Sequence, residues 1–244
     1  MSGDREIRAS AERFRDDTGT ADQGAGAALD EYAAGRGTER EVLTALAAAR
    51  LLVPVVAVLG EQAADGSEKD STMALPTLIG NDGRAAIIAF TGLAALTAWR
   101  PDARPIPVEA GRVWQAAVAE GQAVVVDVAG PVPVVVEGAR LAALAAGQPP
   151  PAPHEDPDIR AEVEAAIAPE DAIAGARVTQ GRAGGDLAVQ FLVRPGGDWE
   201  PAVRRAATLL SGRLAARLRR GIEIGAAPAA SRAASGAASR TAAQ

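Results

Sequence analysis

Residues 73–99, MALPTLIGNDGRAAIIAFTGLAALTAW, decide the fold that this sequence predicts. Near the middle, Asn81-Asp82-Gly83 separates two apolar runs, and these residue types tolerate the positive φ values that hairpin turns require. The run Ala85–Phe90 is apolar at every position, which is typical of a strand covered on both faces, although its length also suits a buried helix. Thr91 stands where it can cap a following helix. The apolar side chains of that helix share one face: Leu93, Leu96 and Trp99. The stretch therefore predicts strand, turn, strand and a helix packed on a sheet.

Length and composition limit the kinds of protein that this chain can be. With 244 residues, of which 48% are hydrophobic, it is long enough for one large or two small domains, and we expect two. The net charge of −6 offers no general electrostatic reason to bind nucleic acid or an anionic membrane. The chain contains no cysteine, so disulfides, thiolate nucleophiles and cysteine-ligated metal sites are excluded.

Membrane targeting and insertion are not predicted. The first ten residues, MSGDREIRAS, carry both charge signs and lack the apolar core of a signal peptide, so we expect a cytoplasmic protein. The longest apolar stretch, residues 42–59, is interrupted by Arg50 and Pro54. A bilayer span needs roughly 20 strongly apolar residues. We therefore expect no stable membrane insertion.

Changes in composition along the chain predict five parts. The first lacks apolar periodicity and is expected to be a disordered arm. The second is a domain of the α/β or α+β class, a mixed sheet with flanking helices. A proline-rich linker, a smaller α+β domain and a disordered tail rich in Ala, Ser and Arg follow. In order, the parts are residues 1–37, 38–147, 148–158, 159–225 and 226–244.

Local signals place several elements within these parts. Thr38 and Glu41 have the spacing of a helix capping box. Two apolar runs, residues 123–128 and 132–136, are separated by a short turn and predict an antiparallel pair of strands.

In the smaller domain, Asp156 and Pro157 are the favoured start of a helix. Strands are expected at residues 176–180 and 187–194, followed by a long helix over residues 199–220 and a short strand over residues 222–224. The first helix has one apolar stripe, Ile159, Val163 and Ile167.

The inventory of reactive residues argues against most kinds of enzyme. The single histidine, His154, lies in the proline-rich segment, where a solvated side chain is favoured over a pH-sensitive or metal-binding one. The single lysine, Lys69, lies between Glu68 and Asp70, where a surface ion pair is favoured over a Schiff-base lysine. Neither the GxxxxGK[ST] nor the GxGxxG phosphate-binding motif follows a strand.

Carboxylates remain as candidates for acid–base or metal chemistry. Asp127 is the best of them because it interrupts the run VVVDVAG near a strand end, and Glu137 ends a neighbouring run. We favour the interpretation that Asp127 points to solvent or closes a turn at Gly130. We therefore assign no catalytic, cofactor-binding or metal-ligating residue and expect no cofactor.

One helix invites a more specific interpretation. Residues 203–220, VRRAATLLSGRLAARLRR, form an amphipathic pattern with arginines on one face. Such a helix can lie on an anionic membrane or on nucleic acid. More often it packs its apolar stripe on a sheet and leaves its arginines in solvent, and we favour that reading for Arg204 to Arg220.

Residues 51–147 resemble the SseB family, named for enhanced serine sensitivity, at its N-terminal domain. Three segments carry the resemblance: LLVPVVAVLG, MALPTLIGNDGRAAIIAFTGLAALTAWRPDARPIPV and VVVDVAGPVPVVVEG. Asp82-Gly83 and Phe90-Thr91 stand where the family has its D-G and F-T motifs. Gly92 replaces the serine that members more often have after that threonine. The likeness is greatest to actinobacterial members. It implies no established activity, cofactor or substrate.

These observations favour a non-enzymatic cytoplasmic interaction or accessory protein with an unidentified protein partner. The alternative is a small-molecule-binding regulatory module, connected to amino-acid metabolism through the family name alone. Association with a membrane or nucleic acid through the helix from Arg204 to Arg220 is a third hypothesis, and self-association stays open.

Overall fold

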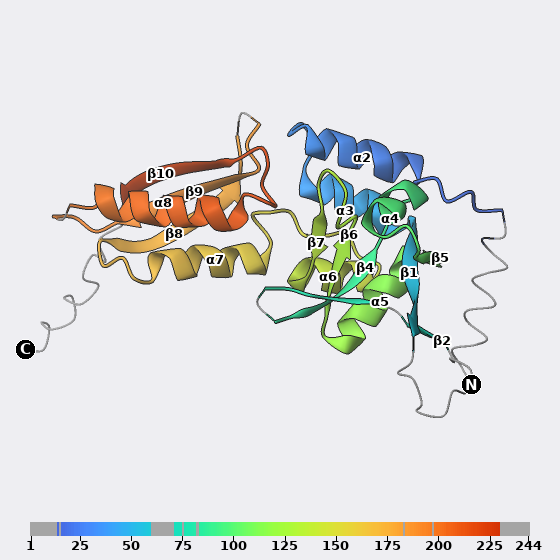
Figure 1. Ribbon diagram of the computed structural model, residues 1–244. Coiled ribbons are helices and arrows are strands. Elements are labelled where there is room, and N and C mark those ends of the chain that lie inside the picture. Colours follow the sequence, from blue (N-terminus) through green and yellow to red (C-terminus); the bar gives the residue numbers. More distant parts are fainter. Residues whose placement is uncertain are drawn as a thin grey trace, which may run out of the picture.

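The computed structural model describes residues 14, 16–59, 71–74, 76–81, 83–182, 184–196 and 198–229. Its elements gather into two groups, which we call the N-terminal unit (α2 to α6) and the C-terminal unit (α7 to β10) (Figure 1). The N-terminal unit contains α2 (Gln23–Ala33), α3 (Glu39–Ala47), β1 (Arg50–Leu59), β2 (Ser71–Ala74), β3 (Thr77–Ile79), β4 (Ala85–Ala89), α4 (Leu93–Trp99), β5 (Arg104–Glu109), α5 (Ala110–Glu120), β6 (Ala123–Val126), β7 (Val134–Val136) and α6 (Gly138–Ala145). The C-terminal unit contains α7 (Pro157–Ile167), β8 (Ile173–Gln180), β9 (Leu187–Val193), α8 (Glu200–Leu214) and β10 (Ile222–Pro228). Of the α/β and α+β classes that the sequence leaves open, the structure has the α+β class.

The main sheet of the N-terminal unit has the strand order β3-β4-β6-β7. β3 and β4 form the predicted antiparallel hairpin, in which Ile79 lies opposite Ala85. β4 runs parallel to β6, and β6 pairs with β7 in the predicted antiparallel arrangement. The sheet is therefore mixed, as the sequence predicts.

A second sheet, β2-β1-β5, is joined to the main one by a bridge between Leu52 and Phe90. Leu52 and Phe90 exchange two backbone hydrogen bonds, of 2.7 and 2.8 Å, at the end of β4. Leu96 of α4 packs into the small core beside this bridge, and the ring of Trp99 lies 5.5 Å from that of Phe90. The predicted packing of this helix on the sheet is thus confirmed.

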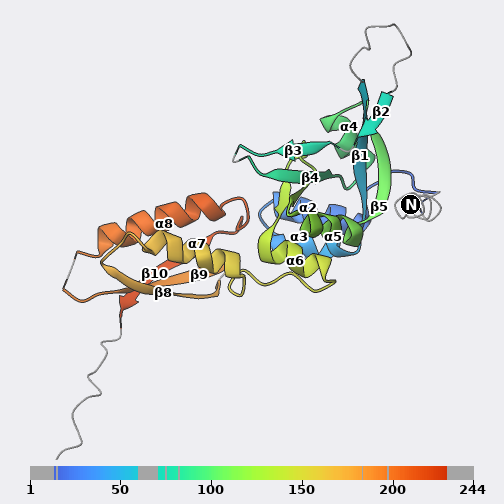
Figure 2. The same cartoon turned by 90° about the horizontal axis from the view of Figure 1, so that it is seen from below.

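Helices cover both faces of the main sheet (Figure 2). α2, α3, α5 and α6 lie on one side and α4 on the other. The larger core lies under the four helices, and its largest side chain, Trp114 of α5, is 0% exposed. The predicted capping box starts α3: Thr38 Oγ1 accepts a hydrogen bond from the Glu41 N–H at 3.2 Å, and Glu41 Oε2 accepts one from the Thr38 N–H at 2.7 Å.

The prediction of a disordered arm over residues 1–37 is wrong for its second half. Asp22 accepts a hydrogen bond from the Ala25 N–H at 3.0 Å and caps α2. Ala25 and Tyr32 are only 1% and 2% exposed in the main core. Its apolar stripe recurs at i, i+3, i+4, i+7 and i+8 but consists mostly of alanine, so packing on the main core stabilises the helix. The stripe is Ala25, Ala28, Leu29, Tyr32 and Ala33. Residues 1–13 and 15 lie outside the described part of the chain.

The C-terminal unit is a three-stranded sheet, β10-β9-β8, with α7 and α8 packed on one core. β8 pairs antiparallel with β9, and β10 pairs parallel with β9. The strands predicted at residues 176–180 and 187–194 are confirmed as the cores of β8 and β9, and the helix predicted at Pro157 begins there, capped by Asp156.

Two predicted boundaries in this unit are wrong. The long helix ends at Leu214 instead of residue 220. In a continued helix the Ala216 carbonyl would accept a hydrogen bond from the Arg220 N–H. Here it accepts one from the Tyr32 hydroxyl at 2.5 Å, and the Arg220 N–H donates to Asp186 Oδ2 at 2.9 Å. The last strand continues to Pro228, so the predicted tail begins later, and residues 230–244 lie outside the described part.

Candidate functional site

Asp127, the best candidate of the sequence, is a buried structural residue. Its side chain is not in solvent, because the residue is only 7% exposed. Oδ1 accepts a hydrogen bond from the Thr91 N–H at 2.9 Å, and Oδ2 accepts one from the Thr91 hydroxyl at 2.7 Å. Its carbonyl accepts a hydrogen bond from the Gly130 N–H at 2.7 Å, so the predicted turn at Gly130 is confirmed. Thr91 does not cap α4: the N-cap residue is Gly92, with no side-chain cap bond.

The pKa of Asp127 predicts how stability should respond to pH. Burial raises this pKa, and the hydrogen bonds from Thr91 oppose the rise. Because the folded-state pKa lies above the unfolded one, stability is lost as pH rises from the unfolded pKa through the folded one. In Asp127→Asn the amide can accept from the Thr91 N–H and donate to its hydroxyl, with no charge to bury. We expect the variant to gain stability over the wild type with rising pH, by at most about 1.4 kcal/mol per pH unit.

Urea unfolding of both proteins from about pH 3 to pH 8 measures this difference. Two parallel stability profiles would contradict the assignment of a raised pKa to Asp127.

The other residues singled out in the sequence are not brought together. In the antiparallel register of β6 and β7, Val126 lies opposite Val134, so Glu137 is at the far end of the sheet from Asp127. Glu137 instead pairs with Arg84 at 2.6 Å. The His154 Nε2 atom lies 3.9 Å from Glu155 Oε1, and Lys69 lies outside the described residues. Among the described residues, no group of three His, Cys, Asp or Glu side chains is arranged to hold a metal ion.

Several arginines of the predicted basic helix are neutralised by carboxylates. Arg205 donates two hydrogen bonds, of 2.9 and 2.6 Å, to Glu170, and Arg213 donates one of 2.8 Å to Glu162. These pairs reduce the positive charge that the helix can offer to an anionic surface. No helix in the described ranges has the length and apolar character needed to cross a bilayer.

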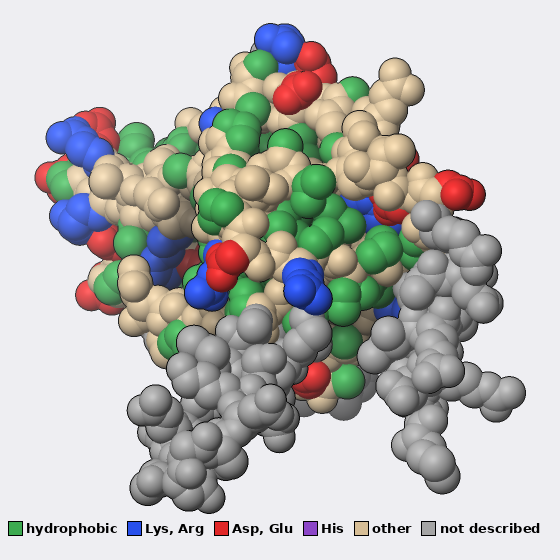
Figure 3. Space-filling view, turned by 45° about the vertical axis from the view of Figure 1, so that its right-hand side comes forward, with side chains coloured by type: hydrophobic (Ala, Val, Ile, Leu, Met, Phe, Trp, Pro, Cys, Tyr) green, Lys and Arg blue, Asp and Glu red, His purple; other side chains and the backbone are tan. Residues whose placement is uncertain are grey.

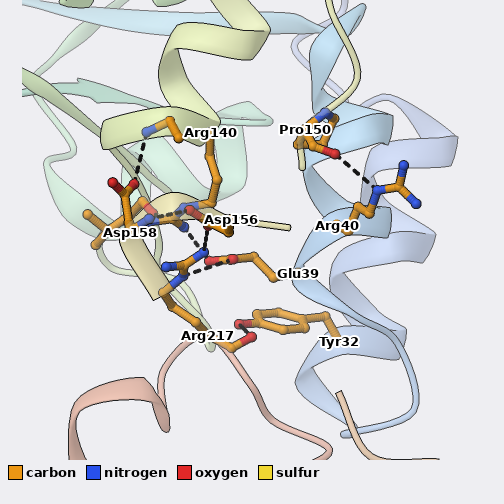
Figure 4. Close-up of polar contacts among 10 residues, drawn as sticks. Tyr32, Glu39, Arg40, Arg140, Pro150, Asp156, Asp158 and Arg217 are labelled. Atoms are coloured by element: carbon orange, nitrogen blue, oxygen red, sulfur yellow. Dashed lines mark hydrogen bonds and ion pairs between the residues drawn. The ribbon is translucent and has the colours of Figure 1, made fainter. Parts of the chain in front are cut away.

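A cluster of four charged side chains joins the two units (Figure 4). Glu39, at the start of α3, accepts hydrogen bonds from Arg140 of α6 at 2.5 Å and from Arg217 at 3.1 Å. Arg217 also donates to Asp156 Oδ2 at 2.5 Å. Arg140 is 3% and Asp156 0% exposed, and burial raises the pKa of Glu39 against the opposing effect of the two arginines. With two guanidiniums and two carboxylates, the cluster compensates its own charges, and we call it the junction cluster.

Hydrogen bonds between side chains and backbone groups lie near the junction cluster and connect the same two units. Arg40 Nε donates to the Pro150 carbonyl at 3.0 Å, and Asp158 Oδ2 accepts from the Ala139 N–H at 2.9 Å. Residues 148–158, predicted as a linker, therefore pack against the N-terminal unit. Sequence reasoning missed this site, because the charged residues that form it come from separate parts of the chain and have no common motif.

A groove between α7 and β8 is a candidate for binding, and we call it the α7–β8 groove. Its volume is about 490 Å³. One face of α7 lines it with residues spaced i, i+3, i+4 and i+7, and β8 lines the other side. The lining residues are Arg160, Val163, Glu164, Ile167, Gly175, Ala176, Arg177 and Val178. The apolar stripe was visible in the sequence through Val163 and Ile167, and a strand was predicted at residues 176–180, but the sequence did not show that the two lie side by side.

The two arginines of the groove differ from those of α8. Arg160 Nη2 donates to the His154 carbonyl at 3.0 Å, and Arg177 Nη1 donates to Gln190 Oε1 at 3.0 Å. In the described part of the chain neither forms an ion pair. Both residues are exposed, but Arg177 lies with Gln190 on the sheet face opposite α7, so only Arg160 presents its guanidinium on the α7 side of the groove.

Elsewhere on the surface, the exposed hydrophobic side chains are scattered and do not line a groove. The large apolar residues that stand exposed in the N-terminal unit come from different elements: Ile79, Leu93, Val118 and Val135. Figure 3 shows hydrophobic side chains near the middle of one face of the molecule, interrupted by charged ones. Scattered exposure of this kind does not by itself mark a binding surface.

Comparison with known proteins identifies part of the chain. Residues 26–143 match the family model described as SseB protein N-terminal domain. No curated protein and no solved structure matches the chain. The match begins within α2, in the segment predicted to be a disordered arm, and leaves the α7–β8 groove outside it.

Proposed function

Residues 26–143 are an SseB N-terminal domain, and on that premise we propose that the protein is a non-enzymatic protein-interaction module that binds its partner at the α7–β8 groove. The SseB domain then acts as the scaffold on which the junction cluster holds the C-terminal unit. The groove presents the binding surface.

The contrast between the buried, hydrogen-bonded carboxylates and the exposed groove carries this proposal. Each buried carboxylate accepts a hydrogen bond from a threonine, an arginine or a backbone N–H: Glu39, Asp127, Asp156, Glu170 and Asp186. A catalytic acid or base needs access to the proton it transfers. The groove, by contrast, has an apolar floor, and the exposed Arg160 of α7 beside it forms no ion pair with described residues.

Affinity purification from the native host, followed by mass spectrometry, tests the proposal with two variants of the full chain. Arg160→Glu reverses the positive charge that α7 contributes to the groove. Arg204→Glu is the control, because Arg204 is exposed on α8 and does not line the groove. We expect to find a partner protein that is retained by the wild type and by the control. The groove variant should retain at least about tenfold less of it.

Equal retention by all three proteins would contradict the groove as the binding surface. Turnover in a broad metabolite screen, abolished by Asp127→Asn, would contradict the non-enzymatic role.

The alternative, a small-molecule-binding regulatory module connected to amino-acid metabolism, is supported by the groove volume of about 490 Å³, which lies in the range of ligand pockets. A ligand that binds the folded state raises its stability. Saturable thermal stabilisation by one metabolite, lost in the groove variant and retained in Arg204→Glu, would favour this alternative.

A further inference from the structure

We propose that residues 16–21, which we call the N-terminal strap, occupy within their own chain a site that binds an acidic peptide segment of another protein. The Asp17 carboxylate of the strap lies on Arg50, where an Asp or Glu of the partner would bind. The inference goes beyond the proposed function, because it concerns a second site, on the N-terminal unit, that shares no lining residue with the α7–β8 groove.

The position of Arg50 in the fold is the first argument. Open sheets with parallel strands commonly bind ligands just beyond the carboxyl ends of those strands. Thr91 follows β4 and Asp127 follows the parallel strand β6, and a 2.7 Å hydrogen bond joins their side chains. Arg50 reaches the same edge from β1, and its Nη1 atom donates to the Thr91 carbonyl at 2.9 Å. Under the strap its side chain is 12% exposed, so the domain holds a largely buried guanidinium at this edge.

The contacts of the strap are the second argument, because they are those of a bound acidic peptide. Arg50 Nε lies 2.5 Å from Asp17 Oδ2, and Nη2 donates to Oδ1 at 3.0 Å. Arginine recognises carboxylates with this planar fork. Two carbonyls of the strap also take part: that of Thr20 accepts from Arg50 Nη2 at 2.5 Å, and that of Gly19 accepts from the Leu93 N–H at 2.7 Å. A peptide can reproduce this whole set of contacts, whereas a small carboxylate reproduces only part of it.

The third argument is that the strap has no hydrophobic anchor. None of residues 16–24, all of which the structure describes, is buried, and the first buried residue is Ala25 of α2. α2 stays on the main core through Ala25 and Tyr32. The strap is held by polar contacts that an external peptide can replace one for one, so exchange requires no loss of core packing. The strap can therefore leave Arg50 while α2 remains in place.

Asp17→Asn tests whether the ion pair holds the strap. The substitution keeps the size of the side chain and removes its charge. We expect amide hydrogen exchange at Leu93, whose N–H donates to the Gly19 carbonyl, to become at least about tenfold faster, while the amides of β6 stay protected. Asp16→Asn is the matched control, because Asp16 is the exposed neighbour of Asp17, and it should leave Leu93 unchanged.

A peptide of the strap itself is the probe for binding. Residues 16–22, DDTGTAD, are synthesised with a fluorophore and titrated against the full chain by anisotropy. We expect Asp17→Asn to bind this peptide at least about tenfold more tightly than the wild type, in which the native strap competes. Replacing Asp17 by Asn in the peptide, or adding Arg50→Met to the protein, should abolish the gain.

Gly92 provides a control on the pose of the peptide. A Cβ atom on Gly92 would stand 2.9 Å from the Ala21 nitrogen of the strap, whereas one on Gly111 of α5 would meet nothing within 4 Å. Added to Asp17→Asn, Gly92→Ala should therefore weaken peptide binding at least about tenfold, and Gly111→Ala should change little.

Unchanged exchange at Leu93 in Asp17→Asn would overturn the role of the ion pair. Equal peptide binding by wild type and Asp17→Asn, or equal effects of the two glycine variants, would overturn the site. Displacement of the peptide by an equal concentration of succinate would assign the site to small carboxylates and overturn the choice of a peptide. Arg160→Glu, added to Asp17→Asn, should leave peptide binding intact, so this inference and the proposed function can fail separately.

Discussion

Arg217→Met is expected to destabilise the folded protein by about 3–5 kcal/mol. The guanidinium bridges Glu39 and Asp156 at 3.1 and 2.5 Å, and Asp156 is 0% exposed. Removing it leaves two buried carboxylates to share Arg140, which lies 3.9 Å from Asp156. An uncompensated charge in a buried site costs far more than the lost contact itself. Urea unfolding followed by far-UV circular dichroism measures the loss.

A matched single variant and a double variant show whether the loss of stability comes from the burial of the charges or from the removal of any arginine. Arg213→Met removes an ion pair whose side chains are 45% and 41% exposed, so about 0–1 kcal/mol is expected. Arg217→Met combined with Glu39→Gln restores charge balance, and its cost should be smaller than the sum of the single costs by about 1–3 kcal/mol. Strict additivity, or equal losses for the two arginine variants, would show that the junction cluster does not act as a charge-balanced unit.

Tyr32→Ala is expected to cost about 3–5 kcal/mol, as large aromatic truncations in a core do. The ring is buried between the N-terminal core and the turn after α8, with the Arg219 guanidinium 5.4 Å from its centroid. Its hydroxyl donates to the Ala216 carbonyl at 2.5 Å. The substitution therefore removes core packing and an interdomain contact together, and thermal or urea unfolding gives its size.

Tyr32→Phe is the control, because it keeps the ring and removes only the hydroxyl. A net loss of about 0.5–1.5 kcal/mol is expected for one hydrogen bond. A Tyr32→Ala cost as small as that of Tyr32→Phe would mean that α2 contributes little to the core.

Elements with strong local signals could be predicted from the sequence. The Asn-Asp-Gly turn between β3 and β4 and the Thr38–Glu41 capping box depend on residues within a few positions of one another. Apolar runs located the strands of the main sheet for the same reason. α2 was missed because its apolar stripe is mostly alanine, in a segment whose composition otherwise resembles a disordered arm; only Leu29 and Tyr32 of the stripe are large.

The candidate sites were less accessible to sequence reasoning. Asp127 was singled out correctly as unusual, but its partner, Thr91, is 36 residues away and was expected to cap a helix. Glu39 and Arg217 are separated by 178 residues, so no local pattern could show that they meet. In the α7–β8 groove, the stripe on α7 was recognisable, whereas the free edge of β8 depends on the order of strands in the sheet.

By itself, the sequence narrowed the fold to the α/β or α+β class and determined the hairpin within residues 73–99 and the resemblance to the SseB family. Each of these rests on turn chemistry, periodicity or recognisable motifs along a short stretch. Only the tertiary structure decided that residues 23–33 are ordered, that the helix of α8 stops at Leu214 and that four charges are buried together between the units. Those outcomes depend on long-range contacts. The energy that orders α2 comes from the core it covers, and a buried charge is tolerated only where distant residues compensate it.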